Sequence, residues 1–363
     1  MTTSIIQLIV LLMASGCKAQ RQRQIWAWAS GSLFRDEGIQ QLYNSSWHSV
    51  IDGIQAWCGC GFSDTGILFN ETSWNSCVPL IEAAKDSGSK FQIVISGAVP
   101  EAAIRDPTPF INDAIAWARL HPEIDGFSID DERDCAPRST VSELEGWVAF
   151  HDVFAEALRS HGLHVTSAVQ AMFGVQNEAN NEPCLFPPYG DKQRLPSDYD
   201  FVQRVPDLMS DSSIQKWLIM DTYYYSTGHF LTTLDWHTQH ISNDKLAVGM
   251  SNLINYRDHW TIDELQARFY AIDKSGIEWI NIFILPANDD FLPFLKRWKS
   301  FCQGCGKQPT LGCYDFDVEC ANDIDLPIAE TQLRASLSDR TGNNIVSPDS
   351  PDVSGISVDD ASA

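Results

Sequence analysis

The residues whose types and spacing could carry out chemistry lie in the octapeptide 125–132, which reads DGFSIDDE. Its mixture of apolar and acidic residues predicts a short buried strand that ends in a glutamate. Side chains alternate between the two faces of a strand, so Ser128, Asp130 and Glu132 share one face. Carboxyl groups two positions apart on such a face lie about 6–7 Å apart. In a partly apolar site their pKa values are pushed apart, so one carboxyl can stay protonated at neutral pH and act as a general acid.

A structural network of ion pairs is the alternative explanation for these carboxylates. We favour catalysis because charge on a strand that also carries Phe127 and Ile129 is costly unless the site uses it. Asp131 points to the opposite face of the strand and needs a partner that the sequence does not identify.

The chain between residues 24 and 301 alternates regularly between strand-like and helical patterns. Eight strands are predicted at 25–29, 50–57, 91–98, 127–132, 164–171, 217–223, 246–251 and 279–285. Eight strand–helix units in one domain predict an α/β fold, a (β/α)8 TIM barrel of parallel strands. The reactive groups of such barrels lie at the carboxyl ends of the strands, and Glu132 ends the fourth predicted strand.

Helices are predicted between most of these strands, because apolar residues recur there at spacings of three, four and seven. The three stripes are Ile111, Ile115 and Ala118; Leu144, Trp147, Phe154 and Leu158; and Ile262, Leu265, Phe269 and Ile272. Thr261 followed by Glu264 predicts a capping box at the start of the third helix. Gly88, Gly162 and Gly276 are predicted to end helices.

The start of the chain, residues 1–19, is typical of a signal peptide, with an apolar run at 4–13 and Ala19 as the cleavage position. A lipoprotein cleavage site at 14–17 is a weaker alternative. The apolar run is too short to span a bilayer comfortably, and no second stretch is suitable. We therefore predict a secreted, extracellular protein without stable membrane insertion, whose barrel domain covers 20–301.

Nine cysteines follow the predicted cleavage position, and export favours disulfide bonds. Their odd number predicts at least one free thiol, and Cys58 and Cys60 are too close in sequence to bond each other. Residues 302–330 form a cysteine-rich segment whose spacing favours disulfides over a zinc site. Residues 331–363, rich in Ser, Asp, Gly and Pro, are predicted to be a disordered tail.

The net charge of −23 argues against nucleic acid or an anionic membrane as a partner. The nine histidines lack the spacing of metal ligands, so no metal or other cofactor is expected. Asn44 and Asn70 begin glycosylation sequons, which predict a glycoprotein where the host glycosylates. We expect a monomer.

The chain from 24 to 301 resembles glycoside hydrolase family 18, the chitinase family. The family signature on the fourth barrel strand is Asp-Gly-x-Asp-x-Asp-x-Glu, which residues 125–132 match except at Ser128. Ser96 lies in a loose version of the family's third-strand motif, Ser-x-Gly-Gly. Residues 220–223, Met-Asp-Thr-Tyr, resemble the sixth-strand motif Met-x-Tyr-Asp with the tyrosine displaced by one position.

The resemblance implies a substrate-assisted, retaining hydrolase that cleaves glycans containing β-linked N-acetylglucosamine, such as chitin. It implies that Glu132 is the general acid and base, that Asp130 orients the acetamido group, and that Tyr223 is its hydroxyl partner. It further implies roles in substrate binding for Asp221, Ser96 and Ser128, and for Phe283, which takes the place of the family's strand-eight tryptophan. Trp26 and Trp28 share one face of the first strand and either line the sugar site or pack in the core.

Two departures from the family pattern leave other functions open. Ser128 can hydrogen-bond Asp130 but cannot share its charge, and Phe283 offers a sugar less stacking area than tryptophan. A chitinase-like lectin that binds glycans without cutting them is therefore the alternative, although Glu132, which inactive relatives usually lose, is present. A third possibility is a barrel glycosidase of another family that pairs Glu132 with an acid such as Asp221.

Overall fold

The computed structural model describes residues 23–30, 35–131, 141–169, 175–177, 182–184, 205–220, 222, 227–251 and 260–300. The predicted signal peptide, cysteine-rich segment and tail lie outside these residues, and their boundaries stay predictions.

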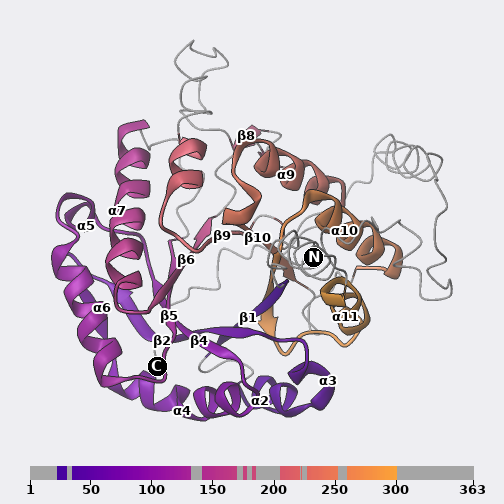
Figure 1. Ribbon diagram of the computed structural model, residues 1–363, viewed down its shortest axis with the longest axis horizontal. Coiled ribbons are helices and arrows are strands. Elements are labelled where there is room, and N and C mark those ends of the chain that lie inside the picture. The colour runs from indigo at the N-terminus through magenta and orange to yellow at the C-terminus, as the bar shows by residue number, and fades with distance from the viewer. Residues whose placement is uncertain are drawn as a thin grey trace, which may run out of the picture.

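A closed barrel of eight parallel strands forms the centre of the molecule (Figure 1). Its strands, in order around the ring, are β1 (Gln24–Ser30), β2 (Gly53–Phe62), β4 (Lys90–Ser96), β5 (Gly126–Asp130), β6 (His164–Val169), β9 (Lys216–Ile219), β10 (Leu246–Ser251) and β11 (Trp279–Leu285). Strand β1 pairs in parallel with both β11 and β2, and this closes the ring. The predicted α/β barrel is therefore confirmed.

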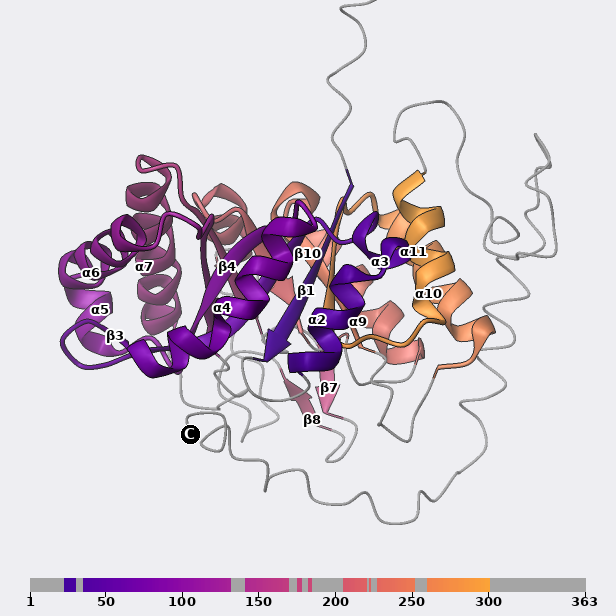
Figure 2. The ribbon, with the colours of Figure 1, turned by 90° about the horizontal axis from the view of Figure 1, so that it is seen from below.

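Helices surround the barrel on its outside (Figure 1). They are α2 (Arg35–Tyr43), α3 (Ser45–His48), α4 (Glu71–Asp86), α5 (Glu101–Arg105), α6 (Thr108–Leu120), α7 (Val141–Arg159), α9 (Thr227–His240), α10 (Ile262–Ser275) and α11 (Phe291–Ser300), with a short 3-10 helix, η1 (Asn243–Lys245), before β10. A small hairpin of β7 (Val175–Asn177) and β8 (Glu182–Cys184) lies on the side toward which β1 points (Figure 2).

Strands β10 and β11 have the predicted bounds, but the second strand differs from its prediction. Strand β2 runs to Phe62 instead of ending at residue 57, and its pairing with β4 shifts register between Ala56 and Cys60. Gly59, with φ +76°, lies in this irregular stretch, and the chain continues as a strand beyond it. The extension pairs antiparallel with a strand that was not predicted, β3 (Ile67–Phe69).

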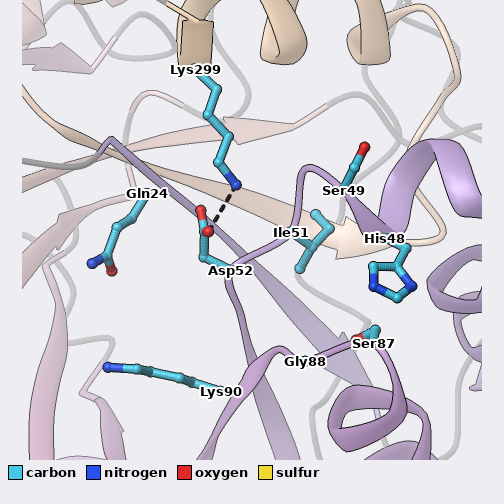
Figure 3. Close-up of a pocket in the computed structure, with 9 residues that line it drawn as sticks. All are labelled: Gln24, His48, Ser49, Ile51, Asp52, Ser87, Gly88, Lys90 and Lys299. Atoms are coloured by element: carbon cyan, nitrogen blue, oxygen red, sulfur yellow. Dashed lines mark hydrogen bonds and ion pairs between the residues drawn. The ribbon is translucent and has the colours of Figure 1, made fainter. Parts of the chain in front are cut away.

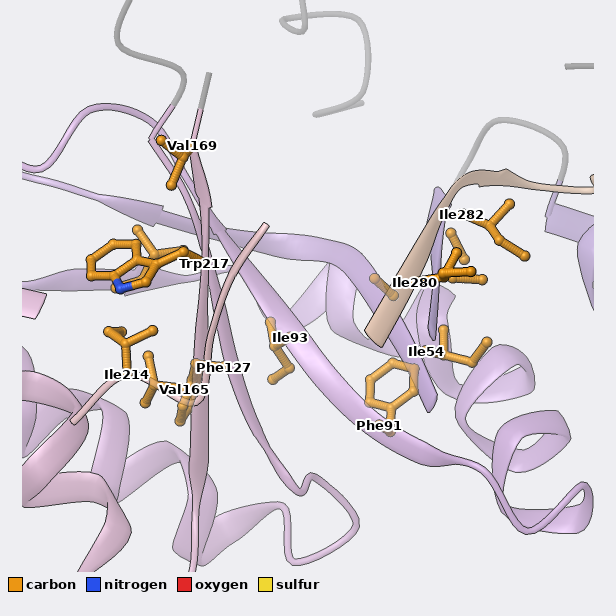
Figure 4. Close-up of a cluster of buried hydrophobic side chains, with 14 of the residues drawn as sticks. Ile54, Phe91, Ile93, Phe127, Val165, Val169, Ile214, Trp217, Ile280 and Ile282 are labelled. Carbon is orange, nitrogen blue, oxygen red and sulfur yellow. The ribbon is translucent and has the colours of Figure 1, made fainter. Parts of the chain in front are cut away.

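Apolar side chains on the outward faces of the strands pack against the helices and form the main core (Figure 4). The predicted stripe of α7, namely Leu144, Trp147, Phe154 and Leu158, is fully buried in this core. The predicted stripe of α6 is wrong by one position, because Phe110, Ala114 and Trp117 are its buried residues. Trp117 stacks on Phe69 of the unpredicted strand β3, with ring centroids 4.4 Å apart, so this strand covers the face of α6 that carries Trp117.

The predicted helix signals of α10 are confirmed. Thr261 and Glu264 form the capping box, and Gly276 ends the helix with φ +76°. Gly88 and Gly162 also have positive φ angles, of +73° and +77°, which glycine adopts without a steric penalty. Ile262, however, is 49% exposed and does not belong to the buried stripe.

A disulfide bond joins Cys58 of β2 to Cys77 of α4. As predicted, Cys58 and Cys60 do not bond each other, and Cys60 is a free, buried thiol. Burial raises the pKa of the Cys60 thiol, so the group stays protonated and unreactive. No helix in the described part of the chain is long and apolar enough to cross a bilayer.

Candidate active site

The amino-terminal end of the barrel lumen is filled by two tryptophans. Trp26 stacks on Trp279, with ring centroids 4.8 Å apart and an angle of 25° between the rings. The Trp26 ring also covers Gly53, where an added Cβ would lie only 2.5 Å from a ring carbon. Because Trp26 is 1% exposed and lies at this end, its position favours core packing over sugar binding.

A layer of buried polar side chains crosses the middle of the lumen. Gln55 Nε2 donates to Gln92 Oε1 (3.1 Å) and to Thr166 Oγ1 (2.8 Å), and Thr166 Oγ1 donates to Gln92 Oε1 (3.0 Å). Asn281 Nδ2 donates to Gln55 Oε1. These bonds tie β2, β4, β6 and β11 together, so they form a rigid floor beneath the carboxyl-terminal end of the barrel.

Asp130 lies at the carboxyl end of β5, where barrel enzymes carry their reactive groups. The residue is 7% exposed, and its Oδ2 atom accepts a hydrogen bond of 3.1 Å from Trp57 Nε1. The Trp57 ring packs against Trp28 (4.7 Å between centroids) and meets Phe283 edge-on (6.2 Å, 89°). We call Asp130, Trp28, Trp57 and Phe283 the aromatic–carboxylate cluster.

The cluster brings together three residues that the sequence predicted, on three different strands: Asp130, Trp28 and Phe283. Trp57 was not predicted, although it ended the predicted strand 50–57. It lies two positions after Gln55, on the inward face and near the carboxyl end of a barrel strand. That combination of face and position would have identified it as a candidate site residue.

Ser96 and Ser128 lie next to the cluster. Ser96 ends β4, is half buried and is paired in register with Asp130. Ser128 is fully buried, and its Oγ atom makes no hydrogen bond within the described part of the chain. The considered hydrogen bond from Ser128 to Asp130 is therefore not formed, because side chains two positions apart on a strand are about 6–7 Å apart.

Asp131 has the opposite orientation and a structural role. It is fully buried outside the lumen, where its Oδ2 atom accepts hydrogen bonds from Val99 N (3.0 Å) and Trp147 Nε1 (2.7 Å). These are the partners that the sequence did not identify. Asp131 thus ties the end of β5 to the segment after β4 and to α7, which holds the strand end in place.

Three predicted site residues, Glu132, Asp221 and Tyr223, lie outside the described residues, and their roles stay predictions. Thr222, between the last two, is fully buried, and its Oγ1 atom donates to Ile219 O (2.8 Å) and Gly249 O (2.7 Å). Among the residues that the structure describes, no group of three His, Cys, Asp or Glu side chains could hold a metal ion.

No known family profile matches the sequence, and no curated protein sequence was found to match it. Solved structures do match the fold. One is a family 18 chitinase from Pseudoalteromonas aurantia, at 14% identity, with a TM-score of 0.51 over 75% of this chain and 97% of that one. A chitinase from Chromobacterium violaceum matches at 10% identity, with a TM-score of 0.54 over 77% of this chain and 99% of that one.

The spore cortex-lytic enzyme SleL of Bacillus megaterium also matches, at 10% identity and a TM-score of 0.53, over 78% of this chain and 75% of the enzyme. Identities this low establish similarity of fold alone. The chain therefore has a barrel fold similar to those of chitinases of glycoside hydrolase family 18 and of SleL.

Proposed function

We propose that this protein is a divergent member of glycoside hydrolase family 18 that cleaves glycans containing β-linked N-acetylglucosamine. The observation that carries the proposal is the placement of Asp130, which lies at the carboxyl end of the fourth barrel strand among the aromatic rings of Trp28, Trp57 and Phe283. The half-buried rings of Trp57 and Phe283 beside this carboxylate suit a sugar ring, whose apolar face stacks while its polar groups hydrogen-bond, and the fully buried Trp28 supports the Trp57 ring from behind. The similarity in fold to chitinases supports the same function.

In the proposed reaction, Glu132 donates a proton to the glycosidic oxygen as the bond from that oxygen to the anomeric carbon breaks. The acetamido oxygen of the substrate attacks the anomeric carbon and forms an oxazolinium ion. Asp130 accepts a hydrogen bond from the acetamido N–H and stabilises the positive charge that develops on the acetamido group. Glu132 then takes a proton from the water that opens the ring, so two inversions leave the configuration retained.

Trp57 contributes to this reaction by holding the Asp130 carboxylate. Its indole N–H donates to one carboxylate oxygen, and its ring is fixed between Trp28 and Phe283. A carboxylate that is already oriented loses little conformational entropy when it meets the acetamido group, and this lowers the barrier. Trp57 is thus a positioning residue that takes over part of the function of the missing aspartate at position 128.

We propose that the protein acts outside the cell as a monomer. The apolar run at residues 4–13 and the Cys58–Cys77 disulfide support export, because disulfides persist in oxidising compartments. The net charge of −23 makes the chain a poor ligand for nucleic acid.

The test is turnover of N-acetylglucosamine oligomers, followed by mass spectrometry of the products, for the parent and for Glu132→Gln. Loss of the general acid should lower kcat by about two to four orders of magnitude. Glu82→Gln, at an exposed site on α4, is the matched control and should leave kcat unchanged. A parent that binds the oligomers without cutting them would instead establish the lectin, and a Glu132→Gln variant as fast as the parent would exclude the assignment.

A further inference from the structure

The end of the barrel opposite to the aromatic–carboxylate cluster carries a pocket of about 440 Å³. It lies where β1, β2 and β4 begin and where α11 ends (Figure 3). Its charged and polar lining includes Gln24, His48, Asp52, Lys90 and Lys299. Small-molecule sites in proteins typically have volumes of about 300–1,000 Å³, so this pocket can hold one sugar unit or a smaller ion.

Both carboxylate oxygens of Asp52, the acidic residue that lines the pocket, accept hydrogen bonds from neighbouring groups. Its Oδ1 atom accepts a hydrogen bond from Lys299 Nζ and its Oδ2 atom accepts one from Ile25 N, both at 2.8 Å. Lys299 Nζ also donates to Val50 O at 2.8 Å. The Asp52–Lys299 pair is therefore neutral as a whole, and its polar atoms are already bonded within the protein.

Two hydrogen-bond donors in the pocket, the Gln24 amide and the Lys90 ammonium group, are not bonded in this way. Gln24 Oε1 accepts a hydrogen bond of 3.0 Å from Trp26 Nε1, and this bond fixes which end of the amide is the donor. The amide NH2 of Gln24 makes no hydrogen bond, and Lys90 makes no ion pair, within the described part of the chain. The two donors lie on the same side of the pocket (Figure 3). The pocket thus carries excess positive charge although the chain has a net charge of −23.

We propose that this pocket binds a small ligand that carries an anionic oxygen group, such as inorganic sulfate, inorganic phosphate or the carboxylate of an acidic sugar. The Lys90 ammonium group supplies the charge and the Gln24 amide supplies a directed N–H donor, and both bind anionic oxygen well. The His48 imidazole also lines the pocket. The site is separate from the proposed glycosidase site and does not depend on its activity.

The test is thermal unfolding in rising sulfate, with chloride at matched ionic strength, repeated with glucuronate and with neutral N-acetylglucosamine. A ligand that binds the folded protein raises Tm along a saturable curve, whereas general salting-out grows linearly. We expect Tm to rise along a saturable curve with sulfate or with glucuronate. The anion that gives this response shows whether the pocket binds an inorganic oxyanion or the carboxylate of an acidic sugar. No saturable response to either anion, or an equal response to N-acetylglucosamine, would overturn the proposal.

Two variants test whether the anion that raises Tm binds in this pocket. Gln24→Glu keeps the acceptor for Trp26 Nε1 but replaces the free donor with a negative charge, so the response should be lost. Lys90→Gln removes one charge at an exposed site and should raise the half-saturating anion concentration at least about tenfold. Arg119→Gln, an exposed site on α6 outside the pocket, loses the same charge and should respond like the parent. An equal response in Lys90→Gln and in the parent would contradict the assignment, while Glu132→Gln should bind normally even where hydrolysis fails.

Discussion

At the amino-terminal end of the lumen Trp26 stacks on Trp279, whereas at the carboxyl-terminal end Trp28 and Trp57 pack beside Asp130. Trp26 and Trp28 are only two residues apart on one strand, and each is 1% exposed. In the pair at the amino-terminal end, Trp26 Nε1 donates to Gln24 Oε1 of the same strand. At the upper end the indole N–H of Trp57 is directed at a carboxylate.

Residue type and burial therefore do not by themselves separate the core-packing tryptophans from those of the proposed site in this barrel. What distinguishes the two ends is the partner of the indole N–H and the direction of the strands, whose carboxyl ends carry the reactive groups. The polar layer of Gln55, Gln92, Thr166 and Asn281 separates the two ends. We therefore expect changes at one end to alter stability and changes at the other to alter catalysis.

The largest expected effect is the loss of stability in Trp26→Ala. Removing a fully buried aromatic side chain costs about 3–5 kcal/mol, because it removes its packing contacts and leaves a cavity. The measurement is the free energy of unfolding from denaturant titration, together with kcat on N-acetylglucosamine oligomers. We expect the stability to fall and kcat to stay near that of the parent. A large loss of kcat in the folded variant would show that the two ends are not independent.

Asp130→Asn should have the opposite signature. The substitution keeps the size of the side chain but removes the negative charge that we propose stabilises the transition state, so kcat should fall by about 10²–10³. The free energy of unfolding should change far less than in Trp26→Ala. Asp131→Asn is the informative comparison, because this neighbour bonds Val99 N and Trp147 Nε1 and should lower stability. An equal loss of kcat in Asp130→Asn and Asp131→Asn would contradict the assignment of catalysis to the inward face of β5 and of stability to its outward face.

Trp57→Phe separates ring packing from hydrogen bonding. Phenylalanine keeps an aromatic ring beside Trp28 but cannot donate to Asp130 Oδ2. Hydrogen bonds to charged groups contribute about 1.5–3 kcal/mol, so kcat should fall by about 10- to 150-fold. In the Asp130→Asn background the same change should cost less, because the two residues act together. Additive losses in this double-mutant cycle would show that Trp57 does not act through Asp130.

The sequence predicted the barrel well because eight strand patterns and their helices agree with one closed topology. The octapeptide 125–132 singled out Asp130, the family resemblance singled out Phe283, and Trp28 was one of two alternatives on the first strand; the structure places these three residues near one another around Trp57. It failed where tertiary contacts overrule local pattern. Trp117 of α6 packs on Phe69 of the unpredicted strand β3, and β2 continues through a register shift near Gly59 beyond its predicted end.

The partner of Trp57 could not be predicted, because 73 residues separate Trp57 from Asp130 and only the packing of β2, β4 and β5 side by side brings them together. The same is true of Asp131, whose partners Val99 and Trp147 belong to two different segments outside the barrel. The sequence also could not decide whether Trp26 packs in the core or lines the sugar site. Alternation along the strand places Trp26 and Trp28 on the same face, so only the structure shows at which end of the lumen each one lies.

The smallest expected effect comes from Phe283→Trp, which introduces the tryptophan typical of glycoside hydrolase family 18 at this position. Phe283 is half buried and meets Trp57 edge-on, so it already belongs to the aromatic–carboxylate cluster. A larger ring should stack on more of the sugar, and aromatic contacts differ by about 0.5–1.5 kcal/mol, so KM should fall about two- to tenfold with little change in kcat. Steady-state kinetics on N-acetylglucosamine oligomers measures both constants. Phe269→Trp, in the outer core, is the control that enlarges a ring away from the site and should leave KM unchanged. A higher KM in Phe283→Trp would mean that the larger ring blocks the sugar, and the carboxyl-terminal end would then be built for a smaller or differently shaped glycan.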